Sequence, residues 1–247
     1  MRYALISDIH ANLPALEAVL RHIAGSGPLA TYHIGDLVGY APWPNETVAL
    51  LTERGIQGVA GNYDSTVASD YKHCGCKYED AEQERLSHVS FEWTKANTSP
   101  ESKLALGELP FRLDVRAAGG HAAGATITLV HGTPVLNTVY WTEDRPDDFC
   151  RKMAALAGLK AGDVIAFGHT HKPWHRVIDG IHFVNTGSVG RPKDGDPRAC
   201  YVVVDLGGAA AEVEFVRVEY DVERAARGIA EAGLPEAFAR QLRTGGA

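Results

Sequence analysis

The chain has 247 residues, of which 45% are hydrophobic and 22% are charged, and it carries a formal net charge of −7. This balance is typical of a globular protein with a sizeable core, and the acidic charge argues against bulk binding of nucleic acid or a membrane surface. Four cysteines are too few for a disulfide scaffold. No apolar run approaches the ~20 residues of a membrane helix, and the N-terminus lacks the pattern of a signal peptide. We therefore expect one cytoplasmic domain spanning residues 1–247, of undetermined oligomeric state.

The first sixty residues alternate between apolar runs and helical patterns. Residues 2–7 predict a strand, and Leu13–Ala24 predicts a helix because its apolar residues recur at helical spacing. A strand at Thr31–Ile34, a helix at Pro44–Arg54 and a strand at Ile56–Ala60 follow. Strands that alternate with helices predict an α/β fold, in which functional sites lie at the carboxyl ends of the strands.

Residues 65–109 are more polar, and we predict a helical insertion there with helices over Glu79–Lys95 and Pro100–Leu109. The insertion begins directly after the third strand, so we expect it to overhang the carboxyl ends of the strands. Its Cys74-Gly75-Cys76 segment lacks the C-x-x-C spacing of zinc and redox motifs. We interpret these cysteines as two loop thiols, because a disulfide across one residue would be strained.

The second half of the chain is rich in strands. The strands at Ala199–Leu206 and Glu212–Glu219 form an antiparallel pair around Gly207-Gly208. Two short helices split at Gly233 close the chain over residues 221–243. The remaining predicted elements are strands at Phe111–Val115 and Ala125–Val130 separated by Gly119-Gly120, a helix at Asp147–Ala157, and strands at Asp163–Phe167 and His182–Val184.

Polar side chains follow the apolar runs where the predicted strands end. One such pair, Asp8 and His10, could simply mark a strand leaving the core, but the pattern recurs through the chain, often beside a glycine. Seven ligands are too many for one tetrahedral ion and suit two divalent cations bridged by a carboxylate. Their nitrogen and oxygen donors favour Mn²⁺, Fe or Zn²⁺, and paired cations about 3.5–4 Å apart are typical of displacement at phosphorus. The candidate ligands are Asp8, His10, Asp36, Asn62, His131, His169 and His171.

The combined motifs, over residues 3–190, resemble the five-block signature of the calcineurin-like metallophosphoesterases. The blocks are Asp8-Ile9-His10, Gly35-Asp36, Gly61-Asn62-Tyr63-Asp64, His131-Gly132 and Gly168-His169-Thr170-His171. The resemblance implies a four-layer α/β/β/α sandwich of two mixed sheets, with the metal site at the strand ends. It also implies that a water or hydroxide between the ions attacks phosphorus. In this family pattern Asp8, His10, Asp36 and His171 hold one ion, Asp36 bridges, and Asn62, His131 and His169 hold the other.

Two positions depart from the family pattern. The block that often reads Gly-Asn-His has Tyr63 in place of the histidine that assists the leaving group, although Asp64 follows. A phenol with a pKa of about 10 is a weaker acid than imidazolium, so we consider His73 as an alternative acid. The Asp-Arg-Gly of enzymes acting on phosphoproteins and dinucleoside polyphosphates is also missing after Asp36, which favours the small prokaryotic phosphodiesterase branch.

From these motifs we assign two sets of residues, one to catalysis and one to binding of the substrate phosphate. The residues that would act on substrate are Asp36, Asn62, Tyr63, Asp64 and His131. Arg191 and Lys193 would anchor a phosphate in place of the missing arginine, with a solvated turn as the equal alternative, and His73 would contact substrate. We interpret Trp174 as core packing rather than a base-stacking residue.

The sequence thus predicts a dimetal hydrolase of small phosphate esters, foremost a phosphodiesterase. A phosphomonoesterase acting on small molecules or proteins is the alternative enzyme. A third possibility is a protein that is not an enzyme but a metal-binding regulator. The tyrosine at position 63, in place of the histidine that assists the leaving group, would explain the loss of useful turnover.

Overall fold

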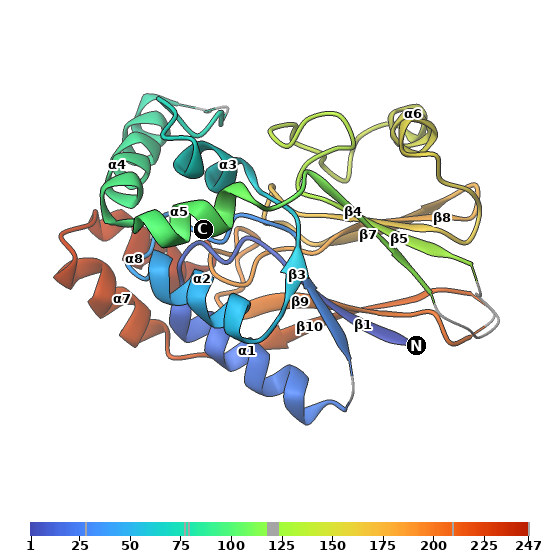
Figure 1. The fold of residues 1–247 in the computed structure, drawn as a ribbon, viewed down its shortest axis with the longest axis horizontal. Coiled ribbons are helices and arrows are strands. Elements are labelled where there is room, and N and C mark those ends of the chain that lie inside the picture. Colours follow the sequence, from blue (N-terminus) through green and yellow to red (C-terminus); the bar gives the residue numbers. More distant parts are fainter. Residues whose placement is uncertain (28, 77, 79, 118–123, 209, 247) are drawn as a thin grey trace.

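The computed structural model describes residues 1–27, 29–76, 78, 80–117, 124–208 and 210–246, and it contains two five-stranded mixed sheets (Figure 1). The predicted helix start at Glu79 and the predicted turn at Gly119-Gly120 lie outside the described residues. The sheets stack face to face, and helices cover their outer faces, which confirms the α/β/β/α arrangement.

The first sheet has the strand order β10-β9-β1-β2-β3. Its three N-terminal strands are parallel, and Ile6 of β1 lies opposite His33 of β2. Strand β9 runs antiparallel to β1, and β10 pairs antiparallel with β9, as predicted for the C-terminal pair. The strands are β1 (Arg2–Ile6), β2 (Ala30–His33), β3 (Gln57–Gly58), β9 (Ala199–Asp205) and β10 (Glu212–Val218).

The second sheet has the strand order β4-β5-β6-β8-β7, with β5, β6 and β8 parallel. The sequence did not predict β7, an edge strand whose middle residues are mostly polar and only partly buried. It pairs with β8 through a tight turn at Asp179-Gly180, where both residues have positive φ. The strands are β4 (Arg112–Arg116), β5 (Thr126–Val130), β6 (Val164–Phe167), β7 (Trp174–Ile178) and β8 (Ile181–Asn185).

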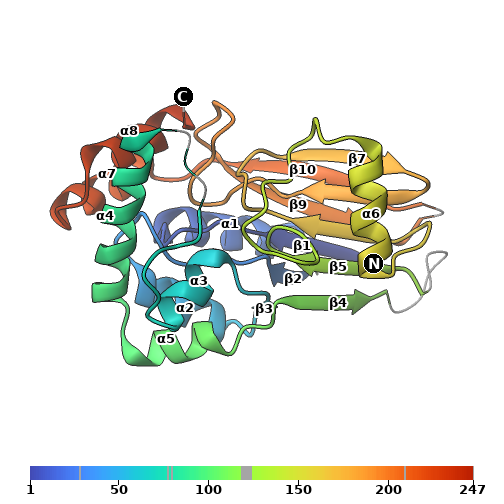
Figure 2. The same cartoon turned by 90° about the horizontal axis from the view of Figure 1, so that it is seen from above.

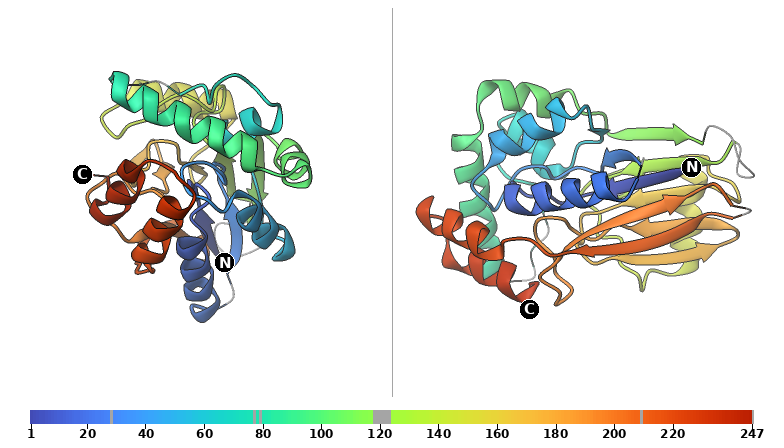
Figure 3. Two further views of the ribbon diagram at one scale, coloured as in Figure 1. Left: turned by 90° about the vertical axis from the view of Figure 1, so that its left-hand side faces the viewer. Right: turned by 90° about the horizontal axis from the view of Figure 1, so that it is seen from below.

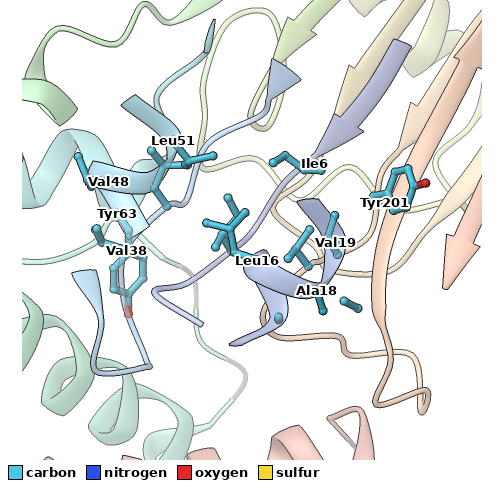
Figure 4. Close-up of a cluster of buried hydrophobic side chains, with 14 of the residues drawn as sticks. Ile6, Leu16, Ala18, Val19, Val38, Val48, Leu51, Tyr63 and Tyr201 are labelled. Atoms are coloured by element: carbon cyan, nitrogen blue, oxygen red, sulfur yellow. The ribbon is translucent and has the colours of Figure 1, made fainter. Parts of the chain in front are cut away.

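Helices α1 (Leu13–Gly25) and α2 (Pro44–Glu53) pack on the first sheet, and α6 (Asp147–Ala157) packs on the second. The side chain of Asn12 accepts a hydrogen bond from the Ala15 amide and so caps α1. Figure 4 shows the core that results, where Ile6 of β1 meets Leu16 of α1. Each fully buried aliphatic side chain of this kind contributes roughly 1.5–3 kcal/mol. A second core fills the space between the sheets, and Trp174 lies in the third, against α6, as expected.

The remaining helices gather at the end of the sandwich opposite the N-terminus (Figures 2 and 3). The sequence did not predict α3, which begins at Asn62, just before the predicted insertion, and continues into it. The last two helices form an antiparallel hairpin that packs on Ala11 and Ala41. None of the described helices is long and apolar enough to cross a membrane. These helices are α3 (Asn62–Ala68), α4 (Ala81–Asn97), α5 (Pro100–Gly107), α7 (Val222–Glu231) and α8 (Glu236–Thr244).

Candidate metal centre

The loops that follow the strands bring six buried side chains into two triads. In each triad the candidate ligand atoms all lie within 4.8 Å of one another. Asn62, the seventh candidate ligand, places its Oδ1 3.1 Å from Nε2 of His131 and so adjoins the second triad. The first triad is Asp8, His10 and His171, and the second is Asp36, His131 and His169.

The Asp36 carboxylate lies between the two triads. Its Oδ2 is 3.6 Å from Nε2 of His10 in one triad and 3.4 Å from Nε2 of His131 in the other. Its Oδ1 accepts a hydrogen bond of 2.9 Å from the Tyr63 amide at the start of α3. One oxygen therefore holds the carboxylate in place, while the other faces both groups of ligands.

Backbone carbonyls orient three of the four imidazoles. Because a carbonyl oxygen only accepts, each Nδ1 must carry a hydrogen, so in the neutral imidazole Nε2 is the nitrogen whose lone pair faces the site. The Nε2 atoms of His10 and His171 are only 3.1 Å apart. Two lone pairs at that distance repel unless a proton or a cation lies between them. The hydrogen bonds join His10 to Val38 (3.1 Å), His131 to Ile34 (2.8 Å) and His171 to Arg191 (2.6 Å).

The protonation states of three of the four imidazoles, His10, His169 and His171, match the needs of metal ligation. Burial, reinforced by neighbouring imidazoles, lowers the pKa values of His10 and His169 to about 3, so both are neutral and able to donate a lone pair. Nε2 of His169 is buried and finds no hydrogen-bond partner among the residues that the structure describes. Although burial favours neutral His131, the Asp36 carboxylate raises the pKa of His131 to about 10, and a cation would have to displace that proton. The donor set therefore fits two divalent cations.

Five of the candidate ligands share an unusual backbone conformation. Their φ angles are positive, in the left-handed region that residues with a Cβ rarely adopt. Each such residue costs of order 1 kcal/mol, and this kind of strain concentrates at functional sites. The angles are 50° at Asp8, 50° at His10, 51° at Asp36, 66° at His169 and 61° at His171.

Two glycines allow the ligands to approach one another. A Cβ on Gly61 would overlap the Asp36 carboxylate and backbone, and a Cβ on Gly168 would overlap the side chains of Asp8 and Ser7. Close packing therefore requires glycine at positions 61 and 168, each of which is adjacent in the sequence to a candidate ligand.

The structure gives Asp64 a bracing role instead of a place in the cavity. Its Oδ2 accepts from the Gly61 amide at 2.9 Å, and its Oδ1 accepts from the Leu37 amide at 2.8 Å. Burial and the neighbouring Asp36 raise the pKa of Asp64 to about 7. Asp64 thereby joins the segment after β2 to the start of α3, which favours a positioning role over the catalytic role expected from the sequence.

The structure also turns the Tyr63 hydroxyl away from the metal ligands. The side chain is 1% exposed and belongs to the hydrophobic core drawn in Figure 4. Its hydroxyl lies 3.5 Å from Oγ of Ser87 and 3.4 Å from Oγ of Ser90, both on α4. Only the ring faces His10, in an edge-to-face contact with centroids 5.6 Å apart. Tyr63 also lines the metal cavity, but the contacts of its hydroxyl favour a packing role over that of a proton donor to the leaving group.

The alternative acid, His73, is exposed on the insertion, and its Nδ1 accepts from the Gly75 amide. It is not among the residues that line the metal cavity.

The prediction of two loop thiols is wrong, because the structure joins Cys74 to Cys76 in a disulfide. Gly75 has a φ of 73°, which turns the chain and brings the two Cα atoms to 5.4 Å, within the usual range for disulfides.

A cavity with about 250 Å³ of free space, including its open mouth, lies over both triads. Arg191 and Lys193, the two residues that we expect from the sequence to bind phosphate, are among those that line it. Two other lining residues, Tyr40 and Tyr140, were not predicted. The Tyr140 ring lies 4.5 Å from that of His169, although it comes from the long loop before α6, which carries no local signal of function.

This geometry agrees with the results of comparisons with known proteins. Residues 1–208 match the family model of the calcineurin-like phosphoesterase superfamily domain. The chain belongs to this superfamily. As a calcineurin-like phosphoesterase it is a metal-dependent enzyme, and its two triads are the candidate sites for the metal ions.

Several relatives resemble this phosphoesterase over most of its length. An uncharacterised protein of Methanocaldococcus jannaschii is 31% identical and aligns with 97% of this chain and 96% of its own. Phosphodiesterase YfcE of Escherichia coli is 26% identical and aligns with 83% of this chain and 88% of its own. The crystal structure of a metallophosphoesterase from Sphaerobacter thermophilus has a TM-score of 0.75 at 29% identity and covers 99% of this chain and 100% of that one.

Proposed function

We propose that this protein is a phosphodiesterase that hydrolyses small phosphate esters with two bound divalent cations, of which Mn²⁺, Fe or Zn²⁺ suit the donors best. The observation that carries the proposal is the set of lone pairs facing one another around Asp36, above all the 3.1 Å separation of Nε2 in His10 and His171. The similarity to phosphodiesterase YfcE supports the choice of diesters.

In this proposal the first triad holds one cation, the second triad with Asn62 holds the other, and Asp36 bridges them. Two cations bound there would activate a water for attack on phosphorus and neutralise the phosphate oxygens as charge develops. Arg191 and Lys193 would bind the remaining phosphate oxygens. Because the Tyr63 hydroxyl faces α4, we expect solvent to protonate the leaving group, so esters with acidic leaving groups should react fastest.

A phosphomonoesterase is the second candidate, and the two cationic side chains favour it. Arg191 and Lys193 add two positive charges to the cavity, which suits the dianion of a monoester better than the monoanion of a diester. The same two cationic side chains could also bind a diester that carries one further anionic group.

The test compares bis(p-nitrophenyl) phosphate with p-nitrophenyl phosphate at saturating Mn²⁺, with the chelated protein and Asp36→Ala as controls. We expect the higher kcat/KM for the diester and no hydrolysis in either control. A higher value for the monoester would establish the second candidate. Hydrolysis of neither substrate by protein with two bound metals would favour a non-catalytic role. That residues 1–247 form one domain and that the protein is cytoplasmic remain proposals from the sequence.

A further inference from the structure

The segment that carries Arg191 and Lys193 packs against the end of α8. The amide of Gly195 donates a hydrogen bond of 3.0 Å to the carbonyl of Gly245, the residue that caps α8. A Cβ on Gly246 would lie 2.8 Å from Cα of Lys193, so the two backbones are in close contact. Helix α8 lies beyond residue 208, where the match to the superfamily model ends. The two cationic residues of the cavity are therefore supported by a helix outside the matched region.

The backbone of Arg191 is fixed by the metal centre. Its carbonyl accepts a hydrogen bond of 2.6 Å from Nδ1 of His171, and its amide donates one of 2.8 Å to Oγ of Ser188. The Ser188 hydroxyl donates in turn to the carbonyl of Asp8 at 2.7 Å. The backbone of Arg191 is thus tied to two candidate metal ligands, and only its side-chain torsions remain to be set.

Two contacts set the position of the Arg191 guanidinium. Its Nη2 donates a hydrogen bond of 2.6 Å to Oε1 of Gln241 on α8, and its central carbon lies 3.8 Å from the centre of the Tyr40 ring. Tyr40 and Arg191 both line the metal cavity. Because a guanidinium carries several N–H donors in a fixed plane, it can keep the bond to Gln241 and still bind a phosphate.

A glutamine suits this place because its side-chain oxygen is neutral. A carboxylate would pair with the guanidinium and offset the positive charge that attracts a phosphate. The amide oxygen of Gln241 orients the guanidinium and leaves that charge in place. An arginine that is ordered before binding loses less conformational entropy when the anion arrives.

We propose that Gln241 is a positioning residue for the substrate. Its side-chain oxygen holds the Arg191 guanidinium at the metal cavity, so that α8 prepares a phosphate-binding group before the ester arrives. The inference rests on the proposed function, since it requires a phosphate at the metal centre in contact with Arg191.

The test measures binding first, so it does not depend on turnover. Isothermal titration calorimetry on the Mn²⁺-loaded protein follows methylphosphonate, an anion that resembles the substrate phosphate and cannot be hydrolysed. Gln241→Met and Gln241→Ala both remove the acceptor oxygen, the first with the length of the side chain kept. We expect either to raise the Kd about fivefold, because Arg191 must then be ordered at the moment of binding. For bis(p-nitrophenyl) phosphate, KM should rise by a similar factor while kcat changes less than about twofold.

A double-mutant cycle separates positioning from a merely structural role. In the Arg191→Ala background, adding Gln241→Met should leave the Kd unchanged, because no guanidinium remains to be held. Arg243→Met is the matched control, since it introduces the same side chain on α8 at an exposed residue that pairs with Glu223. The control variant should keep the Kd and the KM of the wild-type protein.

An unchanged Kd in both Gln241 variants, an equal loss in the Arg191→Ala background, or an equal loss in Arg243→Met would overturn the inference. If the wild-type protein still hydrolyses the diester, those results leave the proposed function intact. The expected cycle in a protein that hydrolyses no phosphate ester would support the positioning role and refute the hydrolytic function. Failure of the wild-type protein with two bound metals to bind methylphosphonate would refute the phosphate site and the inference together.

Discussion

Removing only the hydroxyl of Tyr63 should leave hydrolysis almost unchanged, although the family pattern puts a leaving-group acid at this position. The substitution Tyr63→Phe deletes one oxygen, which lies 3.5 Å and 3.4 Å from the Oγ atoms of Ser87 and Ser90. Both distances exceed the usual ~2.7–2.8 Å of a hydroxyl hydrogen bond. The ring contacts to Tyr40 and Phe91, with centroids at 5.2 Å and 5.8 Å, do not involve the hydroxyl, and phenylalanine keeps them.

The expected loss of stability is small. A typical hydrogen bond contributes about 0.5–1.5 kcal/mol net, and the two long contacts put the Tyr63 hydroxyl near the lower limit. In a protein of 247 residues, 1 kcal/mol shifts the melting temperature by roughly 2–4 °C. We therefore expect Tyr63→Phe to lower the melting temperature by about 1–2 °C and to change kcat less than about twofold.

The assay combines scanning calorimetry with kcat for one aryl and one alkyl diester at saturating Mn²⁺. Tyr63→Leu serves as the matched control, because it removes the ring from a buried position and should cost about 2–5 kcal/mol. General acid catalysis contributes about 10²–10⁴-fold. A hundredfold fall in kcat of Tyr63→Phe for the alkyl ester, with metal content unchanged, would refute our reading of the hydroxyl.

Three further outcomes follow from the geometry of the site. Asp36→Ala should bind neither cation by elemental analysis, and two metals per chain in that variant would contradict the bridging role. Arg191→Gln should raise KM about tenfold with little effect on kcat, as expected for the loss of one charge-assisted contact to phosphate, whereas Arg198→Gln, at an exposed arginine paired with Asp196, should change neither. Because Asp36 raises the pKa of His131 to about 10, metal affinity should increase with pH toward that value, and calorimetry at pH 8 in buffers of different ionisation enthalpy should detect about one proton released from His131. The proton on His131 also stabilises the metal-free fold. Its contribution is fully present below pH ~6.5 and is lost as the pH rises through about 10. If metal binding at pH 8 released no proton, the raised pKa of His131 would be excluded.

The candidate ligands could be found from the sequence because their signal is local. An apolar run followed by a polar residue beside a glycine marks the end of a buried strand, and parallel strands bring such ends together. Asn62 fits this pattern only in part, since β3 is two residues long and Asn62 opens α3. The sequence did not reveal α3 because part of its cap comes from a distant residue. The Asp36 carboxylate accepts from the Tyr63 amide, which no side chain at Gly61 can do.

The Cys74–Cys76 disulfide was missed for a different reason. The spacing of one residue predicts separate thiols, and the left-handed turn at Gly75 that brings the two Cα atoms to 5.4 Å is not visible in a sequence. Strand β7 was missed because an edge strand with partly exposed polar residues lacks the apolar pattern of its neighbours.

By itself the sequence determined the α/β class, most of the strands and helices, and the set of side chains from which two metal sites can be built, because each depends on residues close together in the chain. Only the tertiary structure decided what those side chains do. It turned the Tyr63 hydroxyl toward Ser90, made Asp64 a brace, and brought Tyr140 beside His169. It also placed Phe238, some two hundred residues away in sequence, against Tyr40 at the edge of the site. Such contacts depend on packing between distant segments, and no local pattern encodes them.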